Sequence, residues 1–166
     1  MIKMTLTPDE LYQALVVGGH RRITCIRGRQ KPQHYSSPNG DEWSTEIESC
    51  CAELVVSKYL GKYWSGGVFS GERAGHDVDG KQVRCTPHPN GRLIIYPEDN
   101  PEDNFILVTG RAPDYIIRGW INGAKAISKG TDHTWWTEPT IKRSPSWWVP
   151  QEALRPMPTR DELRTV

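Results

Sequence analysis

The chain has 166 residues, 36% of them hydrophobic, with 21 Lys and Arg, 20 Asp and Glu, and a formal net charge of +1. This length favours one domain with a sizeable core, and the near-neutral charge excludes a strongly basic protein, so any binding of nucleic acid depends on local charge. No apolar run approaches the length that spans a bilayer and no signal peptide precedes the first expected helix, so we expect a cytoplasmic protein without a membrane partner.

The first expected helix begins at residues 7–10, Thr-Pro-Asp-Glu. Thr can cap the helix, Pro suits its first position and Glu completes a capping box. An apolar stripe follows, and Gly18-Gly19 predicts the end of the helix, because glycine readily adopts the conformation found after helix ends. Residues 20–26 then predict a short strand with Ile23 and Cys25 facing inward.

A basic segment without any acidic residue runs from His20 to His34. Its cations are Arg21, Arg22, Arg27, Arg29 and Lys31. They are candidate nucleic-acid-binding residues, because clustered cations bind backbone phosphates. A solvated basic loop explains the same composition equally well, and residues 30–41 read as a Pro/Ser/Gly-rich loop.

The next helix is expected from residue 44 or 45 to residue 60, before Gly61. Glu53 lies among apolar residues of its buried stripe. From this pattern alone, an acidic side chain at the rim of a packed face is the simpler interpretation, and a functional edge is the alternative. Glu46, two turns earlier on the same side, is a second candidate.

Asp79-Gly80 is a strong signal for a two-residue hairpin turn, because these residues tolerate the positive φ angles of a type I′ turn. The turn pairs Val78 with Lys81 and places Asp77 opposite Gln82. Alternation along a strand then directs Asp77, Gln82 and Arg84 to one face. Such a face suits a phosphate and a divalent metal ion, but an ordinary charged hairpin on a solvated face fits the same residues.

The remaining pattern predicts mainly strands and turns. Within the strand expected at Asn104–Gly110, residues Phe105–Val108 are apolar without alternation, which predicts a central strand covered on both faces. The other expected elements are strands at 92–96, 115–121 and 147–149, a solvated acidic turn at 97–104, a helical turn at 122–127 and a short helix at 150–154. We therefore expect an α+β or α/β fold with a single mixed β-sheet of about five strands flanked by helices, forming one domain over 1–157 with a frayed tail at 158–166.

A helix carrying Glu53, a strand carrying Asp77 and a paired strand with Gln82-Val83-Arg84 resemble the core of the PD-(D/E)XK, or restriction-endonuclease-like, nuclease superfamily. A longer series also resembles a family of small bacteriophage and prophage proteins. That series comprises Ala52-Glu53, Lys58-Tyr59, Tyr63-Trp64, His76-Asp77-Val78, Gln82-Val83-Arg84, Gly91-Arg92-Leu93-Ile94, Phe105–Gly110, Gly119-Trp120-Ile121 and Trp148-Val149-Pro150.

The resemblance implies that Glu53, Asp77 and Gln82 hold Mg²⁺ or Mn²⁺, and that Arg84 binds the scissile phosphate. Two departures from the superfamily pattern weaken this site. Gln82 stands where the superfamily has an acidic ligand and adds no charge, so the metal should bind weakly. Arg84 stands where it has Lys, and Arg binds phosphate well but cannot act as a base. His76 faces the other side of its strand and is a minor candidate.

The resemblance therefore implies a phage-type metal-dependent DNA endonuclease or DNA-junction-processing protein with a degenerate Gln-x-Arg motif. The alternative is a catalytically inactive nuclease-fold protein that binds nucleic acid or a host protein during phage infection. DNA, a host protein and a second copy of the chain are the expected partners, in the cytoplasm of a bacterial host.

Overall fold

The computed structural model describes residues 1–28, 41–67, 77–130, 135–140 and 144–159. The helices are α1 (Pro8–Ile26), α2 (Glu42–Leu60) and α3 (Gly123–Gly130), and a 3₁₀ turn, η1, spans Gln151–Ala153. The strands are β1 (Ile2–Thr5), β2 (Lys81–Thr86), β3 (Leu93–Ile95), β4 (Asn104–Arg111), β5 (Asp114–Asn122), β6 (Trp136–Thr137) and β7 (Ser146–Val149).

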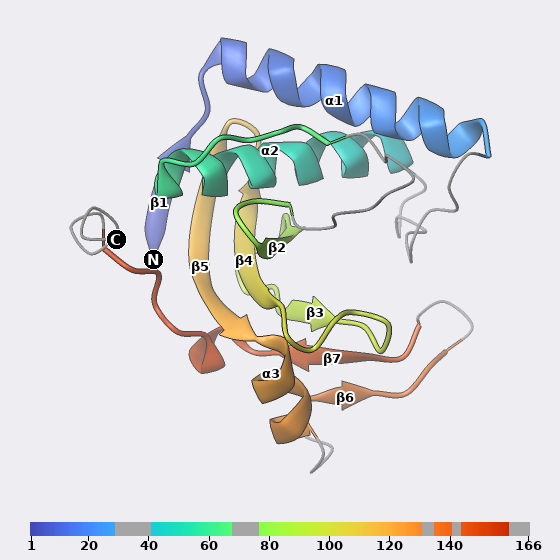
Figure 1. Cartoon of the computed structure of the whole chain (residues 1–166), viewed down its shortest axis with the longest axis vertical. Helices are drawn as coiled ribbons and strands as arrows, with labels where there is room; N and C mark the ends of the chain where they lie inside the picture. The colour runs from blue at the N-terminus through green and yellow to red at the C-terminus, as the bar shows by residue number, and fades with distance from the viewer. Residues whose placement is uncertain (29–40, 68–76, 131–134, 141–143, 160–166) are drawn as a thin grey trace.

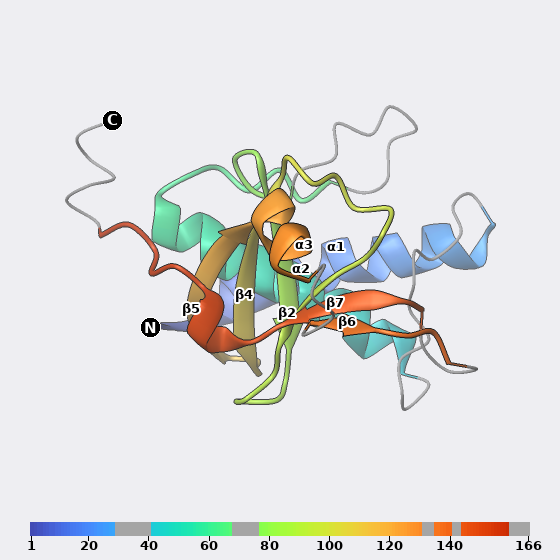
Figure 2. The ribbon, with the colours of Figure 1, turned by 90° about the horizontal axis from the view of Figure 1, so that it is seen from below.

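The fold is a mixed α+β arrangement, as predicted, but the strands form two sheets. The larger sheet has the order β1-β5-β4-β2, in which β2 runs parallel to β4 and the other pairs are antiparallel. The smaller antiparallel sheet has the order β3-β7-β6. Helix α2 lies on the larger sheet and α1 lies outside α2 (Figure 1), while β7 lies on the side of the larger sheet away from α1 (Figures 1 and 2).

Strand β4 separates two apolar cores, which confirms the prediction of a strand covered on both faces. Ile106 and Val108 pack in the core beneath α2, whereas Phe105 and Leu107 pack in the core beside β3 and β7. Because each face of β4 needs an apolar cover, β3, β6 and β7 form a second layer instead of extending a single five-stranded sheet.

Helix α1 continues through Gly18-Gly19 to Ile26, so the predicted helix end and the predicted strand at 20–26 are both wrong. The physical reason is the close approach of α1 to α2. A Cβ atom on Gly18 would lie 2.8 Å from Cα of Ile47, so this glycine allows the two helices to pack. Of the residues expected to face inward, Cys25 is buried but Ile23 is 41% exposed.

Gly18→Ala should lower the free energy of unfolding by about 1–3 kcal/mol, because its methyl group overlaps the α2 backbone. Gly19→Ala is the matched control. Its methyl group would meet no atom within 4 Å, so removing this helix-interior glycine should raise stability by about 0.5–1 kcal/mol. Urea unfolding of both variants in dilute solution measures the difference, and losses of equal size would contradict the tight helix contact.

The other predicted helix ends and the predicted hairpin turn are confirmed. Thr7 and Glu10 form the capping box of α1, and Gly61 ends α2 with φ of 65°. The hairpin turn has positive φ at both central residues, 46° at Asp79 and 73° at Gly80. Helix α2 begins slightly earlier than expected, because the side chain of Asp41 caps it by accepting a hydrogen bond from the Ser44 amide.

The C-terminal elements differ in detail from the predicted ones. Strand β7 starts one residue before the expected strand and lies between β3 and β6, and the expected short helix is the single turn η1. Pro158 accepts a hydrogen bond of 2.6 Å from the Tyr59 hydroxyl, so the start of the predicted frayed tail is anchored. Residues 160–166 of that tail lie outside the described residues. Within the described chain, no helix is both long and apolar enough to cross a membrane.

Candidate functional site

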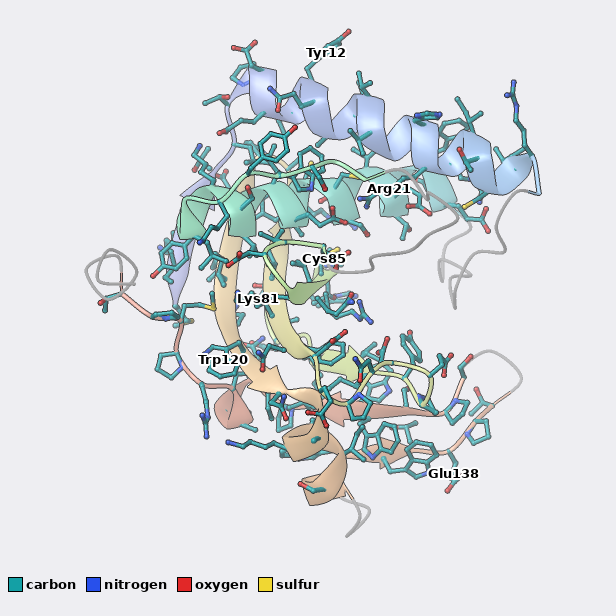
Figure 3. All side chains as sticks on the ribbon, in the orientation of Figure 1. Tyr12, Arg21, Lys81, Cys85, Trp120 and Glu138 are labelled. Carbon is teal, nitrogen blue, oxygen red and sulfur yellow. The ribbon has the colours of Figure 1, made fainter. Side chains whose placement is uncertain are left out.

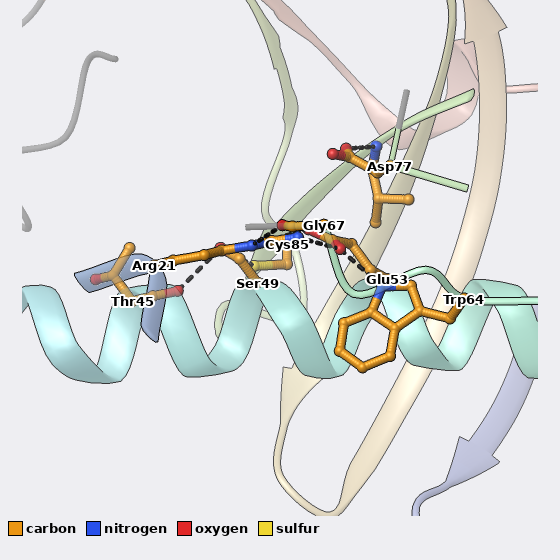
Figure 4. A network of polar contacts seen from close by, with 9 residues as sticks. Arg21, Thr45, Ser49, Glu53, Trp64, Gly67, Asp77 and Cys85 are labelled. Atoms are coloured by element: carbon orange, nitrogen blue, oxygen red, sulfur yellow. Dashed lines mark hydrogen bonds and ion pairs between the residues drawn. The ribbon is translucent and has the colours of Figure 1, made fainter. Parts of the chain in front are cut away.

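The carboxylate of Glu53 is buried on α2 and bound by three donors (Figure 4). Nη1 of Arg21 donates to Oε1 at 2.6 Å, and Nη2 donates to Oε2 at 2.9 Å. The indole Nε1 of Trp64 donates to Oε2 at 2.9 Å. Nε of Arg21 donates to the Gly67 carbonyl at 2.9 Å, so the guanidinium is also held along its edge. Glu53 is therefore the centre of a bidentate, internal ion pair.

Burial and charge act in opposite directions on Arg21. Burial alone would lower its pKa, but the hydrogen bonds and the negative charge of Glu53 outweigh that effect, and the pKa is raised. Arg21 thus stays a cation beside Glu53 at any working pH.

Asp77, at the start of the Asp79-Gly80 hairpin, lies near the Arg21–Glu53 ion pair (Figure 4). Its Oδ2 accepts a hydrogen bond of 2.7 Å from the Val83 amide, and its own amide donates to the Lys81 carbonyl at 3.0 Å. Val78 pairs with Lys81 as predicted. These two hydrogen bonds of Asp77 go to Lys81 and Val83, on either side of the Gln82 position expected to face it.

The pKa of Asp77 is raised to about 6, first by burial and second by the charge of Glu53. The Val83 amide, Arg84 and Arg21 act in the opposite direction. The structure therefore brings together two of the predicted site residues, Glu53 and Asp77, closely enough for one charge to affect the other.

Gln82 and Arg84 share one face of β2, as predicted, but that face is turned away from α2. Cys85 lies on the α2 side, with its Sγ 3.8 Å from Oγ of Ser49. On the opposite side, the guanidinium carbon of Arg84 lies 5.3 Å from the ring centre of Phe105, within the second core. Alternation along the strand places the Gln82 side chain on that side as well.

The acidic turn after β3 binds these two side chains. Nη2 of Arg84 donates to Oδ1 of Asp99 at 2.8 Å, and Nε2 of Gln82 donates to Oδ2 of Asp103 at 3.2 Å. The turn was expected to be a solvated loop. Its aspartates instead neutralise and orient the polar face of β2.

A three-ligand metal site does not fit this arrangement. Glu53 lies on the α2 side of β2, whereas Gln82 lies on the opposite side, so both cannot reach one ion whose ligand bonds are about 2.0–2.6 Å long. In addition, Arg21 and Trp64 already bind the Glu53 carboxylate. In the described part of the chain, no group of three or more His, Cys, Asp or Glu side chains could hold a metal ion.

The cations of the basic segment differ in their surroundings. Arg21 is held by Glu53, and Arg22 forms an ion pair with Glu42. Arg27 is exposed at the C-terminal end of α1. Arg29 and Lys31, like His76, lie outside the described residues.

Three residues that bind the predicted site residues were missed from the sequence. Trp64 binds Glu53, Asp99 binds Arg84 and Asp103 binds Gln82. One signal could have revealed the partner of Glu53. Leu11, Ala14, Gly18, Arg21 and Cys25 recur at intervals of three and four residues, which places Arg21 on the buried stripe of a longer α1. A buried arginine requires a buried acid, and Glu53 occupies the corresponding stripe of α2.

Comparison with known proteins identifies no relative: no family model, curated protein or solved structure matches the chain.

Proposed function

We propose that this protein binds nucleic acid on a nuclease-like core without hydrolysing it. The observation that supports this most strongly is the occupation of both Glu53 carboxylate oxygens by Arg21 and Trp64. A carboxylate in this state has to lose a buried ion pair before it can bind a divalent cation, and such pairs are costly to break. Gln82 adds no charge and lies on the other side of the strand, so it does not compensate.

The end of α1 is the best candidate for the nucleic-acid contact. Arg27 is exposed there, and Arg29 and Lys31 follow in a segment without acidic residues. Arg21 and Arg22 each have an acidic partner within the chain. We therefore assign phosphate contacts to Arg27, Arg29 and Lys31, which would bind the backbone with little preference for sequence.

The test replaces Arg27, Arg29 and Lys31 together by Ala. Binding of fluorescent single-stranded, linear and branched DNA should weaken, and the slope of log affinity against log salt should fall by roughly 0.7–0.9 for each lost contact. A triple Ala variant at exposed cations elsewhere, Lys3, Arg92 and Arg111, has the same change of net charge and is the matched control. Equal binding by the two triple variants would contradict the assignment and favour a host protein as the partner.

The same DNA forms, incubated with Mg²⁺ or Mn²⁺, test the absence of hydrolysis. Neither the parent nor Asp77→Asn should cleave them. Cleavage by the parent that is lost in Asp77→Asn would overturn the non-hydrolytic proposal, because Asn keeps an acceptor for the Val83 amide but removes the charge.

A metal-dependent DNA endonuclease or junction-processing enzyme is the second candidate. One observation favours it: burial first and the charge of Glu53 second raise the pKa of Asp77. Perturbed carboxylates of this kind concentrate at functional sites. In this case Mg²⁺ or Mn²⁺ should support cleavage of DNA by the parent, and Asp77→Asn should abolish it. By the resemblance to phage proteins, either function would operate in the cytoplasm of an infected bacterium.

A further inference from the structure

The outer face of α1 carries a regular apolar stripe. Tyr12, Val16, Gly19, Ile23 and Ile26 recur at alternating intervals of four and three residues, and we call this set the outer seam. Its four apolar side chains are between 41% and 68% exposed, and Tyr12 points away from α2 and the rest of the molecule (Figure 3). Such spacing is typical of the contact line between two packed helices.

The contacts within the chain do not explain this stripe. Helix α1 uses its opposite face, including the buried Ala14, Gly18 and Cys25, to pack against α2. Among the residues that the structure describes, the outer seam has no element packed on it that buries its side chains. The pattern therefore indicates that a helix of another molecule packs on the outer seam.

Gly19 at the middle of the outer seam is a second, independent observation. Glycine in a helix interior lowers stability, so it usually has a packing reason. For Gly18 the reason is contact with α2, but a Cβ atom on Gly19 would meet nothing within 4 Å. A second helix crossing at Gly19 would supply the missing reason, because the absent side chain lets two backbones approach.

The charges at the two ends of the outer seam indicate which helix fits. Asp9 is exposed one turn before Tyr12, and Arg27 is exposed directly after Ile26. An antiparallel copy of α1 brings each Asp9 to the Arg27 of the partner subunit, and it opposes the two helix dipoles favourably. A parallel copy would place like charges together.

We propose that two copies of this chain form an antiparallel dimer through the outer seam of α1. The two-fold axis passes near Val16 and Gly19, so Val16 packs over Gly19 of the partner subunit and Tyr12 packs against Ile23 of the partner subunit. The opposite face of each α1 remains on α2, so the Arg21–Glu53 pair stays intact. This interface shares Arg27 with the proposed phosphate contacts, but it does not depend on the nucleic-acid proposal, because the apolar side chains of the outer seam form the main contact.

Sedimentation equilibrium of the full chain over a concentration series tests the dimer. The parent should dimerise, and Tyr12→Asp should raise the dissociation constant by about 100-fold or more, because it places a charge in the apolar contact with Ile23 of the partner subunit, which the two-fold axis forms twice. Tyr63→Asp makes the same change at a tyrosine that is 87% exposed outside α1, and it should leave the dissociation constant unchanged. Circular dichroism should show that both variants remain folded.

Charge reversal tests the antiparallel arrangement. Asp9→Lys should weaken the dimer several-fold, and adding Arg27→Asp should restore it, because the swapped ends are again complementary. A parent that remains monomeric at its highest soluble concentration overturns the proposal. Equal weakening by Tyr12→Asp and Tyr63→Asp overturns the assignment to the outer seam, and failure of the double reversal to restore the dimer overturns the antiparallel arrangement.

Discussion

Arg21→Ala should lower the free energy of unfolding by about 3–5 kcal/mol, because it leaves the Glu53 carboxylate buried without its counter-charge. The Glu53 side chain is only 5% exposed, so bulk water compensates poorly for the lost guanidinium. Urea unfolding at neutral pH followed by circular dichroism measures the loss.

Two controls separate the loss of an ion pair from the loss of packing. Arg21→Met combined with Glu53→Leu removes both charges and keeps much of the volume, so it should be far less destabilising than Arg21→Ala. Lys58→Ala removes the partner of Glu10 in a more exposed pair and should cost no more than about 1 kcal/mol. If Arg21→Ala cost as little as Lys58→Ala, the buried pair would not hold the two helices together.

Asp77→Asn should stabilise the protein at pH 8 by up to about 3 kcal/mol, given that a shift of one pKa unit is worth about 1.36 kcal/mol. The native-state pKa of Asp77 is raised from 3.8 to about 6, so the folded protein holds this proton more tightly than the unfolded chain does. The resulting stabilisation is complete below about pH 4 and is lost as pH rises through about 6. Asn keeps an acceptor for the Val83 amide without the charge.

The measurement is urea unfolding of parent and variant at several pH values between 4 and 8. The stability of the parent should fall relative to that of Asp77→Asn as pH rises across this range. Asp77→Ala also removes the titration, but it leaves the Val83 amide without its acceptor, so it should be less stable than Asp77→Asn by about 1–3 kcal/mol. A constant difference between parent and Asp77→Asn at every pH would contradict a raised pKa.

The sequence predicted those features whose cause is local. The turn at Asp79-Gly80, the capping box at Thr7 and the end of α2 at Gly61 each depend on a few neighbouring residues, and all three are confirmed. The end of α1 was predicted wrongly from the same kind of signal. Gly18 is needed where α1 packs closely on the backbone of α2, which is distant in the sequence. Tertiary contact overrode the local preference of glycine.

The same contrast between local and long-range causes applies to the candidate site. Strand alternation correctly placed Gln82 and Arg84 on a common face, but it could not show which face of β2 lies on α2. That depends on the parallel pairing of β2 with β4 and on the second core around Phe105. The partners of the charged side chains were also long-range: Arg21 is 32 residues from Glu53, and Arg84 is 15 residues from Asp99.

The bond from the Val83 amide to Asp77 also affects how the protein behaves in a crowded solution. Strand β2 is at one edge of the larger sheet, and an exposed edge can recruit a strand from another molecule and begin aggregation. The Asp77 carboxylate occupies a donor on this edge and adds a negative charge near neutral pH. An incoming strand would have to displace that carboxylate, so Asp77 protects the sheet against edge-to-edge association.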